Sequence, residues 1–151
     1  MHNAQSRYVP DTTVLLRAFV PDREWGEHAK CFLALLITGR ISAVAPKNLT
    51  FEFYGGLTNA FRRRGKTAKD AERALQKFLA LPIEYVDSEE TLRRGAELSL
   101  TYQKSPYDML FFAVAEAQRI AVCTADQRSV DGLPASFPCR HVLLRDFPGN
   151  V

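Results

Sequence analysis

The sequence predicts an α/β fold with a central, mostly parallel sheet of four or five strands and helices on both faces. Short apolar segments alternate with longer segments of helical periodicity along the whole chain, which is typical of a doubly wound parallel sheet. The chain has 151 residues, 46% of them hydrophobic, which is enough for one domain with a substantial core. No repeat, low-complexity segment or long linker divides the sequence. We therefore expect residues 1–151 to form a single domain.

The predicted elements follow one another in regular order. The strands are expected at residues 8–9, 41–45, 83–86, 120–123 and 141–144. The helices are expected at residues 12–20, 23–38, 48–64, 68–81, 87–103, 105–119 and 127–131. The helix at 105–119 is apolar nearly all round, so it should be buried on most sides.

Breaking and capping residues set the predicted helix boundaries. Pro21 and Pro82 each end a helix, because proline cannot continue the hydrogen-bond pattern. Asp22 is placed to cap the helix at 23–38, and Asn48 to cap the helix at 48–64. The segment from Thr67 to Asp70 matches a capping box for the fourth helix.

Two features weaken the pattern. Pro10 lies at the end of the first strand, where proline removes a donor of the hydrogen-bond ladder, so we expect this strand to end early and Asp11 to shift slightly. Gly55 and Gly56 lie inside a predicted helix, and close approach of another backbone is one reason for such a pair.

Four carboxylates lie at junctions between elements. Asp11 follows the first strand, Glu52 lies near the start of the helix after the second, Asp108 opens the buried helix, and Asp126 follows the fourth strand. In a parallel sheet the carboxyl ends of the strands and the helix starts after them share one edge. Four acids from distant segments could therefore converge there.

Each of these acids also has a structural interpretation. Asp11 and Asp126 can be N-caps, and Asp108 lies in a capping box with Pro106 at the first helical position. Glu52 lies near a helix N-terminus, where the dipole favours negative charge. Spacing alone leaves the structural and functional interpretations about even. The combination of all four in regular strand–helix order favours a site.

Clustered carboxylates repel one another, and a divalent cation is the usual remedy. Mg²⁺ and Mn²⁺ prefer carboxylate and water oxygens, and such an ion can activate water for attack on a phosphodiester. The acid cluster therefore predicts a Mg²⁺ or Mn²⁺ site.

The order and spacing of these motifs resemble the PIN-domain family. The matching segments are Asp11-Thr12-Thr13-Val14-Leu15-Leu16, a helical Glu52, Tyr107-Asp108 leading an apolar helix, and Thr124-Ala125-Asp126-Gln127-Arg128 after a short strand. The chain is similar in particular to the small ribonuclease toxins of VapBC-type toxin–antitoxin pairs, over roughly residues 7 to 145.

The resemblance implies a metal-dependent endoribonuclease with Asp11, Glu52, Asp108 and Asp126 as the catalytic set. It implies that Asp11 and Asp108 are the central metal ligands, completed by Asp126 and Glu52 directly or through waters. Thr13 matches a position that hydrogen-bonds within the acid cluster. A cognate antitoxin is the implied protein partner, and a homodimer is expected.

Several basic residues are candidates for contact with a substrate. The run Arg62-Arg63-Arg64-Gly65-Lys66 could bind RNA phosphates or be a solvated helix end, and the second interpretation is somewhat favoured. Arg128, close to Asp126, is better placed to contact a substrate phosphate, and Thr13 is grouped with it as a candidate contact. Arg17 could lie at the same edge. An apolar antitoxin helix is expected to dock on the helices at 12–20, 23–38 and 48–64.

The composition indicates in which compartment the protein is expected and which partners it is expected to bind. The net charge is +3, which is compatible with a polyanionic partner such as RNA. Three scattered cysteines form a poor disulfide framework, and no apolar run is long enough to span a membrane. A cytoplasmic protein without a membrane partner is expected.

Two alternatives stay open. One is a catalytically inactive PIN-fold module that binds RNA or protein. The other is a phosphotransfer domain or phosphatase, which ranks lower because the Asp11-Thr12-Thr13 segment supplies no second acid beside the first.

Overall fold

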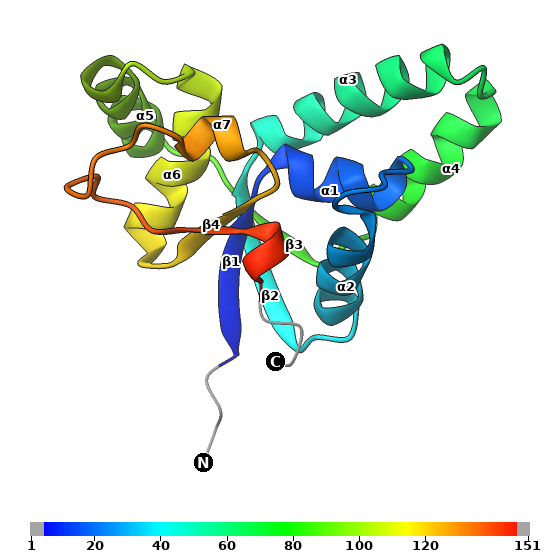
Figure 1. Ribbon diagram of the computed structural model, residues 1–151, viewed down its shortest axis with the longest axis horizontal. Helices are drawn as coiled ribbons and strands as arrows, with labels where there is room; N and C mark the ends of the chain where they lie inside the picture. Colours follow the sequence, from blue (N-terminus) through cyan, green and yellow to red (C-terminus); the bar gives the residue numbers. More distant parts are fainter. Residues whose placement is uncertain (1–4, 148–151) are drawn as a thin grey trace.

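A five-stranded sheet with all strands parallel forms the centre of the protein in the computed structural model, which describes residues 5–147 (Figure 1). The strand order is β3-β2-β1-β4-β5, so β1 lies in the middle. The strands are β1 (Ser6–Pro10), β2 (Ile41–Pro46), β3 (Ile83–Val86), β4 (Ala121–Thr124) and β5 (His141–Leu143). The predicted fold class is confirmed.

Helices cover both faces of this sheet. They are α1 (Thr12–Phe19), α2 (Gly26–Ile37), α3 (Asn48–Arg63), α4 (Ala68–Leu79), α5 (Glu89–Tyr102), α6 (Pro106–Gln118) and α7 (Gln127–Val130), followed by a 3₁₀ turn, η1 (Leu144–Asp146). In Figure 1, α1 to α4 lie on one side of the strands and α5 to α7 on the other, and α3 and α4 form a hairpin that extends away from the sheet.

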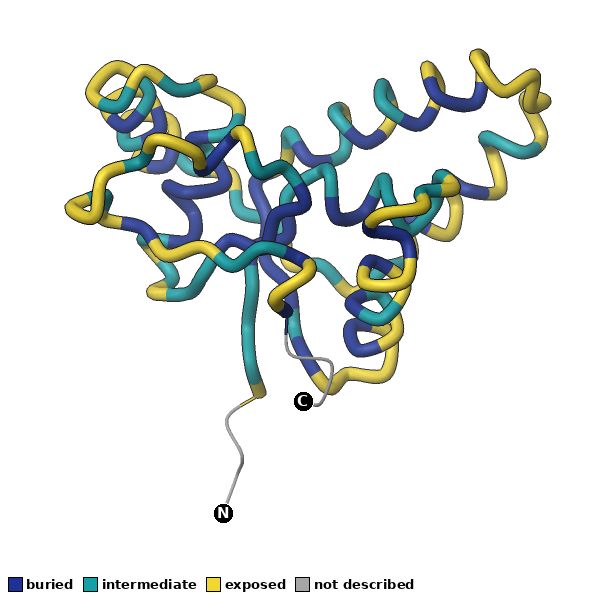
Figure 2. The backbone as a smooth tube through the Cα atoms, in the orientation of Figure 1, coloured by how far each residue is buried: buried dark blue, intermediate teal, exposed yellow. Residues whose placement is uncertain are grey.

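The strands divide their side chains between two cores. Val9, Val44 and Val122 pack on the side covered by α6, whereas Ala43 and Cys123 pack on the side covered by α2. This alternation is the period of two expected of strands covered on both faces. Figure 2 shows the buried residues along the strands and on the inward sides of the helices.

The expectation that Pro10 shortens the first strand is wrong. Pro10 is paired with Cys123 of β4, and the next backbone N–H, of Asp11, donates to the Cys123 carbonyl at 3.0 Å. The pairing of β1 with β2 ends earlier, at Tyr8 and Ala43, so Pro10 lies beyond that ladder and no partner is lost. Asp11 is therefore held directly by the central strand pair.

Two local expectations also need correction. The second helix begins at Gly26 rather than residue 23, because Asp22 accepts the backbone N–H of Trp25 at 2.6 Å in a turn before the helix. Gly56 accommodates a side chain rather than another backbone: a Cβ at this position would lie 2.5 Å from Leu16 Cδ1 of α1. The missing side chain thus lets α1 pack closely against α3.

Candidate active site

Asp11 is the N-cap of α1 and lies at the carboxyl end of the central strand. Its Oδ1 accepts the backbone N–H groups of Thr13 at 3.0 Å and Val14 at 3.3 Å, and also the Thr13 hydroxyl. Its Oδ2 accepts the hydroxyl of Thr124, the last residue of β4. Burial nevertheless raises the pKa of Asp11 to about 6, against the lowering effect of these hydrogen bonds. Asp11 therefore caps α1, as the structural interpretation expects. The cap uses only Oδ1, and Oδ2 bonds Thr124 instead.

The two threonine hydroxyls connect Asp11 to the segment that carries Asp126. The Thr13 hydroxyl accepts the backbone N–H of Ala125 at 3.0 Å, and the Thr124 hydroxyl accepts that of Asp126 at 3.0 Å. Asp126 is the N-cap of α7 and its Oδ1 accepts the backbone N–H of Arg128 at 3.0 Å. Residues 113 positions apart in sequence are therefore held in one hydrogen-bonded unit.

Asp108 is brought to the same edge by α6. Ser105 is the N-cap of this helix, with Pro106 at its start, and its hydroxyl accepts the backbone N–H of Asp108 at 3.5 Å. The pKa of Asp108 is raised by burial and by the charge of Asp126, whereas the charge of Lys104 opposes the rise. Asp126 is therefore close enough for its charge to act on Asp108.

Glu52 lies one turn into α3. Its Oε2 accepts an N–H of Asn48 at 2.6 Å. Burial, then the charges of Asp108 and Asp11, raise the pKa of Glu52 to about 7. The Thr12 hydroxyl also acts on Glu52 and lowers its pKa, whereas the Asn48 Oδ1 is buried without a hydrogen-bond partner among residues 5–147. Glu52 thus lies in a polar environment that is incompletely satisfied.

The structure therefore brings all four predicted acids to one edge of the sheet. Asp11 and Asp126 follow β1 and β4, the neighbouring strands between which the order of the chain reverses. Open α/β sheets bind ligands at such switch points. The charge of Asp108 raises the pKa values of Asp11 and Glu52, and the charge of Asp126 raises that of Asp108, so Asp108 lies electrostatically between the other acids.

The donor set fits a hard divalent cation in its chemistry: carboxylate oxygens, a net negative charge and raised pKa values that a cation would lower. In the side-chain positions present, no group of three Asp, Glu, His or Cys side chains within residues 5–147 is arranged to hold a metal ion. The assignment of Asp11, Asp108 and Asp126 as ligands stays a prediction.

The predicted basic residues are not placed alike. Arg128 is exposed on α7 beside Asp126, and its carbonyl is 3.4 Å from Lys104 Nζ. Arg17 pairs with Asp22 at 2.6 Å and lies over the ring of Trp25 at 5.6 Å, so its charge is directed away from the acids. Arg62 bonds Asn59 at 3.1 Å on the surface of α3.

Sequence reasoning missed three residues that position the acids. Thr124 supports Asp11, Asn48 supports Glu52, and Lys104 donates to the carbonyl of Asp131 at 2.6 Å at the end of α7. Thr124 lies inside the Thr-Ala-Asp motif, and a hydroxyl at the end of a strand beside an acid is a signal for its role. The sequence predicts Asn48 as a cap, but Lys47 occupies that position and Asn48 begins the helix. No sequence signal points to Lys104.

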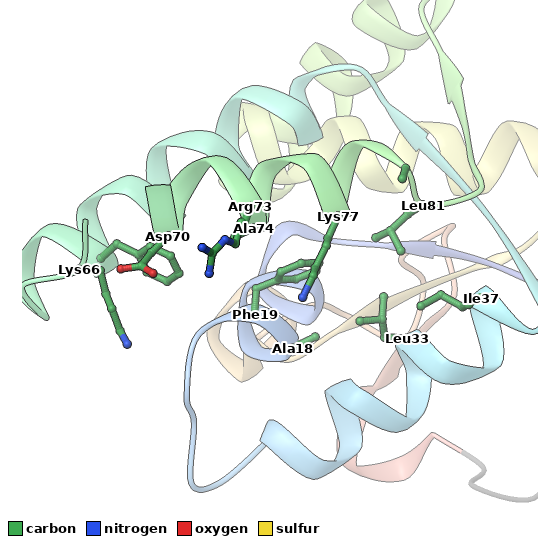
Figure 3. Close-up of a pocket in the computed structure, with 12 residues that line it drawn as sticks. Ala18, Phe19, Leu33, Ile37, Lys66, Asp70, Arg73, Ala74, Lys77 and Leu81 are labelled. Carbon is green, nitrogen blue, oxygen red and sulfur yellow. The ribbon is translucent and has the colours of Figure 1, made fainter. Parts of the chain in front are cut away.

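A second feature lies away from the acids. A groove of about 650 Å³ runs between α4 on one side and α1 and α2 on the other (Figure 3). Apolar side chains of Phe19, Leu33 and Ile37 face the side chains of Arg73 and Lys77 across it. The predicted docking helices are α1, α2 and α3. The groove adds α4 to them, and α3 takes part through Phe61 near its end.

Comparison with known proteins identifies the family. The sequence matches the PIN domain family over residues 8–131, so the chain belongs to the PIN domain family. No match was found among curated proteins. The fold class and the family agree with the resemblance inferred from the sequence motifs.

Solved structures with the same fold include toxin–antitoxin complexes. VapBC2 from Rickettsia felis, bound to a DNA fragment from the promoter, aligns with a TM-score of 0.66 at 16% identity, over 91% of this chain and 98% of that chain. A toxin–antitoxin complex from Klebsiella pneumoniae gives 0.61 at 19%, over 84% and 92%. DNA-bound VapBC from Salmonella typhimurium gives 0.63 at 15%, over 92% and 98%. At these identities the likeness establishes the fold.

Proposed function

We propose that the protein is a Mg²⁺- or Mn²⁺-dependent endoribonuclease, and that it is the toxin of a VapBC-type toxin–antitoxin pair. The observation that carries the proposal is the convergence of Asp11, Glu52, Asp108 and Asp126 at the switch point of the sheet, with raised pKa values for the first three. Membership of the PIN domain family and the toxin–antitoxin complexes among structures of similar fold support it.

Each acid has a role in this proposal. Asp11, Asp108 and Asp126 hold the cation, and the hydroxyls of Thr13 and Thr124 fix the orientation of Asp11. The bound cation would supply Lewis-acid stabilisation of the phosphodiester and lower the pKa of a coordinated water.

Glu52 is the fourth acid, which assists the metal site. Its pKa of about 7 is raised by burial and by the charges of Asp108 and Asp11, and a cation held by those acids would lower it. Its hydrogen bond from Asn48 orients the carboxylate for this role. Arg128, exposed beside Asp126, is a candidate for contact with a substrate phosphate.

The experiment is RNA cleavage by the purified protein with Mg²⁺, with Mn²⁺ and with EDTA. A tRNA and a structured mRNA fragment serve as substrates, and Asp11→Asn and Asp108→Asn are compared with Asp131→Asn, an exposed acid after α7, as the matched control. We expect metal-dependent cleavage that is lost in both site variants and kept in the control. Cleavage that survives both site variants would contradict the proposed site.

The same experiment separates the alternative of an inactive module. If no cleavage occurs, titration calorimetry with Mn²⁺ decides between the two interpretations. Binding that Asp108→Asn abolishes would keep the nuclease proposal and indicate a different RNA substrate. RNA binding without any metal binding would favour the non-catalytic module.

The groove between α1, α2 and α4 is the proposed docking site for the antitoxin. Its apolar walls suit the apolar side of a helix, and the flanking Lys66, Arg73 and Lys77 suit acidic residues along that helix. We expect Leu33→Asp to weaken binding of the cognate antitoxin at least tenfold, because it places a charge on the apolar wall. Leu100→Asp, at an exposed leucine of α5, is the control. Equal affinity of both variants would contradict this docking site, and sedimentation of the isolated chain tests the expected homodimer.

A further inference from the structure

A second groove begins beside the acid cluster and ends among arginines. It has a volume of about 350 Å³ and runs between α1 and α3. Thr13, next to Asp11 in the site, lines one end of it, and Arg63 and Arg64 line the other. Gly56 and Ala60 lie between them. The groove therefore begins at a residue whose hydroxyl donates to Asp11 of the candidate active site.

The geometry of α3 explains this arrangement. Glu52, Gly56, Ala60 and Arg63 are spaced by four, four and three residues, so they share one side of the helix. At 1.5 Å per residue, Arg63 lies about 16 Å along the axis from Glu52. Gly56 and Ala60 between them line the groove together with Leu16 of α1, which packs against Gly56, so these residues form its floor. An extended polymer strand in the groove would pass over this floor from Thr13 to the arginines.

The charge of the groove is positive away from the acids. Asp22, the acid that lines it, is neutralised by Arg17 at 2.6 Å. Arg63 and Arg64 are both exposed, and Arg64 also donates to the Pro21 carbonyl at 3.3 Å, which holds its side chain across the groove. Arg62 belongs to the same basic run, but it does not line this groove and bonds Asn59 instead.

We propose that this α1–α3 groove binds the backbone of single-stranded RNA on one side of the cleaved bond, with Arg63 and Arg64 contacting its phosphates. The inference rests on the proposed function and extends it to the substrate. Arginine binds phosphate oxygens through paired N–H donors, and a groove between two packed helices admits one strand rather than a duplex. Within the basic run at residues 62–66, Arg63 and Arg64 line the groove and bind the substrate, whereas Arg62 does not line it.

The test is fluorescence anisotropy with a labelled 12-nucleotide single-stranded RNA, in EDTA so that no cleavage occurs. The variants are Arg63→Ala, Arg64→Ala and Arg62→Ala, which change the net charge equally, and Arg63→Lys, which keeps it. We expect Arg63→Ala and Arg64→Ala to weaken binding by roughly tenfold and to flatten the salt dependence by about 0.7 in slope for each phosphate that is no longer neutralised. Arg62→Ala should stay within about twofold of wild type, and Arg63→Lys should fall between.

Three results would overturn the inference. They are equal effects of Arg62→Ala and Arg63→Ala, absence of RNA binding by the wild-type protein, and tighter binding of a polyglutamate peptide than of the RNA in competition. The last result would assign the groove to an acidic protein segment. Because RNA binding is measured without metal, this test is independent of the test of metal-dependent cleavage. If the protein cleaves RNA but Arg63→Ala binds RNA normally, the proposed function stands and the proposed RNA-binding groove is wrong.

Discussion

A single hydroxyl group, that of Thr13, helps to fix the geometry of the candidate active site. It donates to Asp11 Oδ1 and accepts the backbone N–H of Ala125, so it fixes the acid after β1 against the segment after β4. From the sequence, Thr13 is expected to hydrogen-bond within the acid cluster, as it does with Asp11, and it is also a candidate substrate contact. Both hydrogen-bonding functions of the hydroxyl are directed at the protein, which makes it a positioning residue.

Thr13→Val removes this hydroxyl with little change of volume. We expect cleavage activity to fall by roughly 10- to 100-fold, since loss of a group that orients a metal ligand typically has an effect of this size. The concentration of Mn²⁺ for half-maximal activity should rise in parallel. Thr13→Ser should retain most of the activity because it keeps the hydroxyl, and a Val variant equal to wild type would contradict the positioning role.

The sequence predicts at which element junctions the four acids lie, but it does not predict the groups that hydrogen-bond to them. Asp11 and Asp126 were found because a carboxylate directly after a strand has a known place in a parallel sheet. Asn48 was missed as a partner of Glu52, because an asparagine at a helix start has a simpler explanation as a cap. Contacts such as that from Lys104 to Asp131 join residues 27 positions apart, and no local pattern encodes them.

The short helix α7 depends on Lys104 for its position. This helix has four residues and carries Asp126 at its start, while Lys104 Nζ bonds the carbonyl of Asp131 at its end. Lys104 directly precedes Ser105, the cap of the helix that carries Asp108. One side chain thereby connects the two segments that supply these acids.

Lys104→Met should loosen this connection while keeping the length of the side chain. We expect roughly tenfold lower metal affinity, measured by calorimetry with Mn²⁺, and little change in the unfolding temperature. Lys104→Arg should restore part of the affinity, because a guanidinium can still donate to the carbonyl. Lys69→Met, at an exposed lysine of α4, provides the control. Unchanged affinity in Lys104→Met would show that α7 is held without it.

The paired glycines of α3 differ in what surrounds them. No atom lies within 4 Å of a Cβ built at Gly55, whereas a Cβ at Gly56 meets Leu16. Gly55→Ala should therefore stabilise the protein by about 0.5–1 kcal/mol through helix propensity. Gly56→Ala should gain less or lose stability, because Leu16 must move. Chemical denaturation of both variants tests the difference, and a larger gain for Gly56→Ala would contradict the packing.

The acid cluster destabilises the whole molecule at neutral pH. The pKa values of Asp11 and Glu52 are raised from 3.8 to about 6 and from 4.5 to about 7. A raised pKa means that the folded state binds more protons than the unfolded state between these values, so stability falls as the pH rises through this interval. The contribution of these two acids to the free energy of unfolding is fully present below about pH 4, and it is completely lost somewhat above pH 7.

We expect the free energy of unfolding in EDTA to fall by roughly 2 kcal/mol between about pH 5 and about pH 7.5, given about 1.4 kcal/mol per pKa unit and relaxation of the coupled acids. Asp11→Asn and Glu52→Gln should each reduce this dependence. Mg²⁺ should raise the unfolding temperature more at the upper end of this range than at the lower end. A pH-independent stability in EDTA would contradict the raised pKa values.

The fold as a whole could be predicted from the sequence because strands and helices alternate and because proline and capping residues mark most helix boundaries. The all-parallel order follows from βα repetition, and five strands lie within the expected range. The effect of Pro10 could not be anticipated, since it depends on where the pairing of β1 with β2 stops. Within the described residues no helix is long and apolar enough to cross a bilayer.

The position of β4 in the chain has a consequence for synthesis on the ribosome. The central strand β1 is synthesised more than a hundred residues before its neighbour β4 and the following Asp126. Until that segment leaves the exit tunnel, Asp11 lacks the Thr124 hydroxyl and the cluster lacks its fourth carboxylate. A nascent chain that has not yet reached residue 126 therefore cannot assemble the complete site.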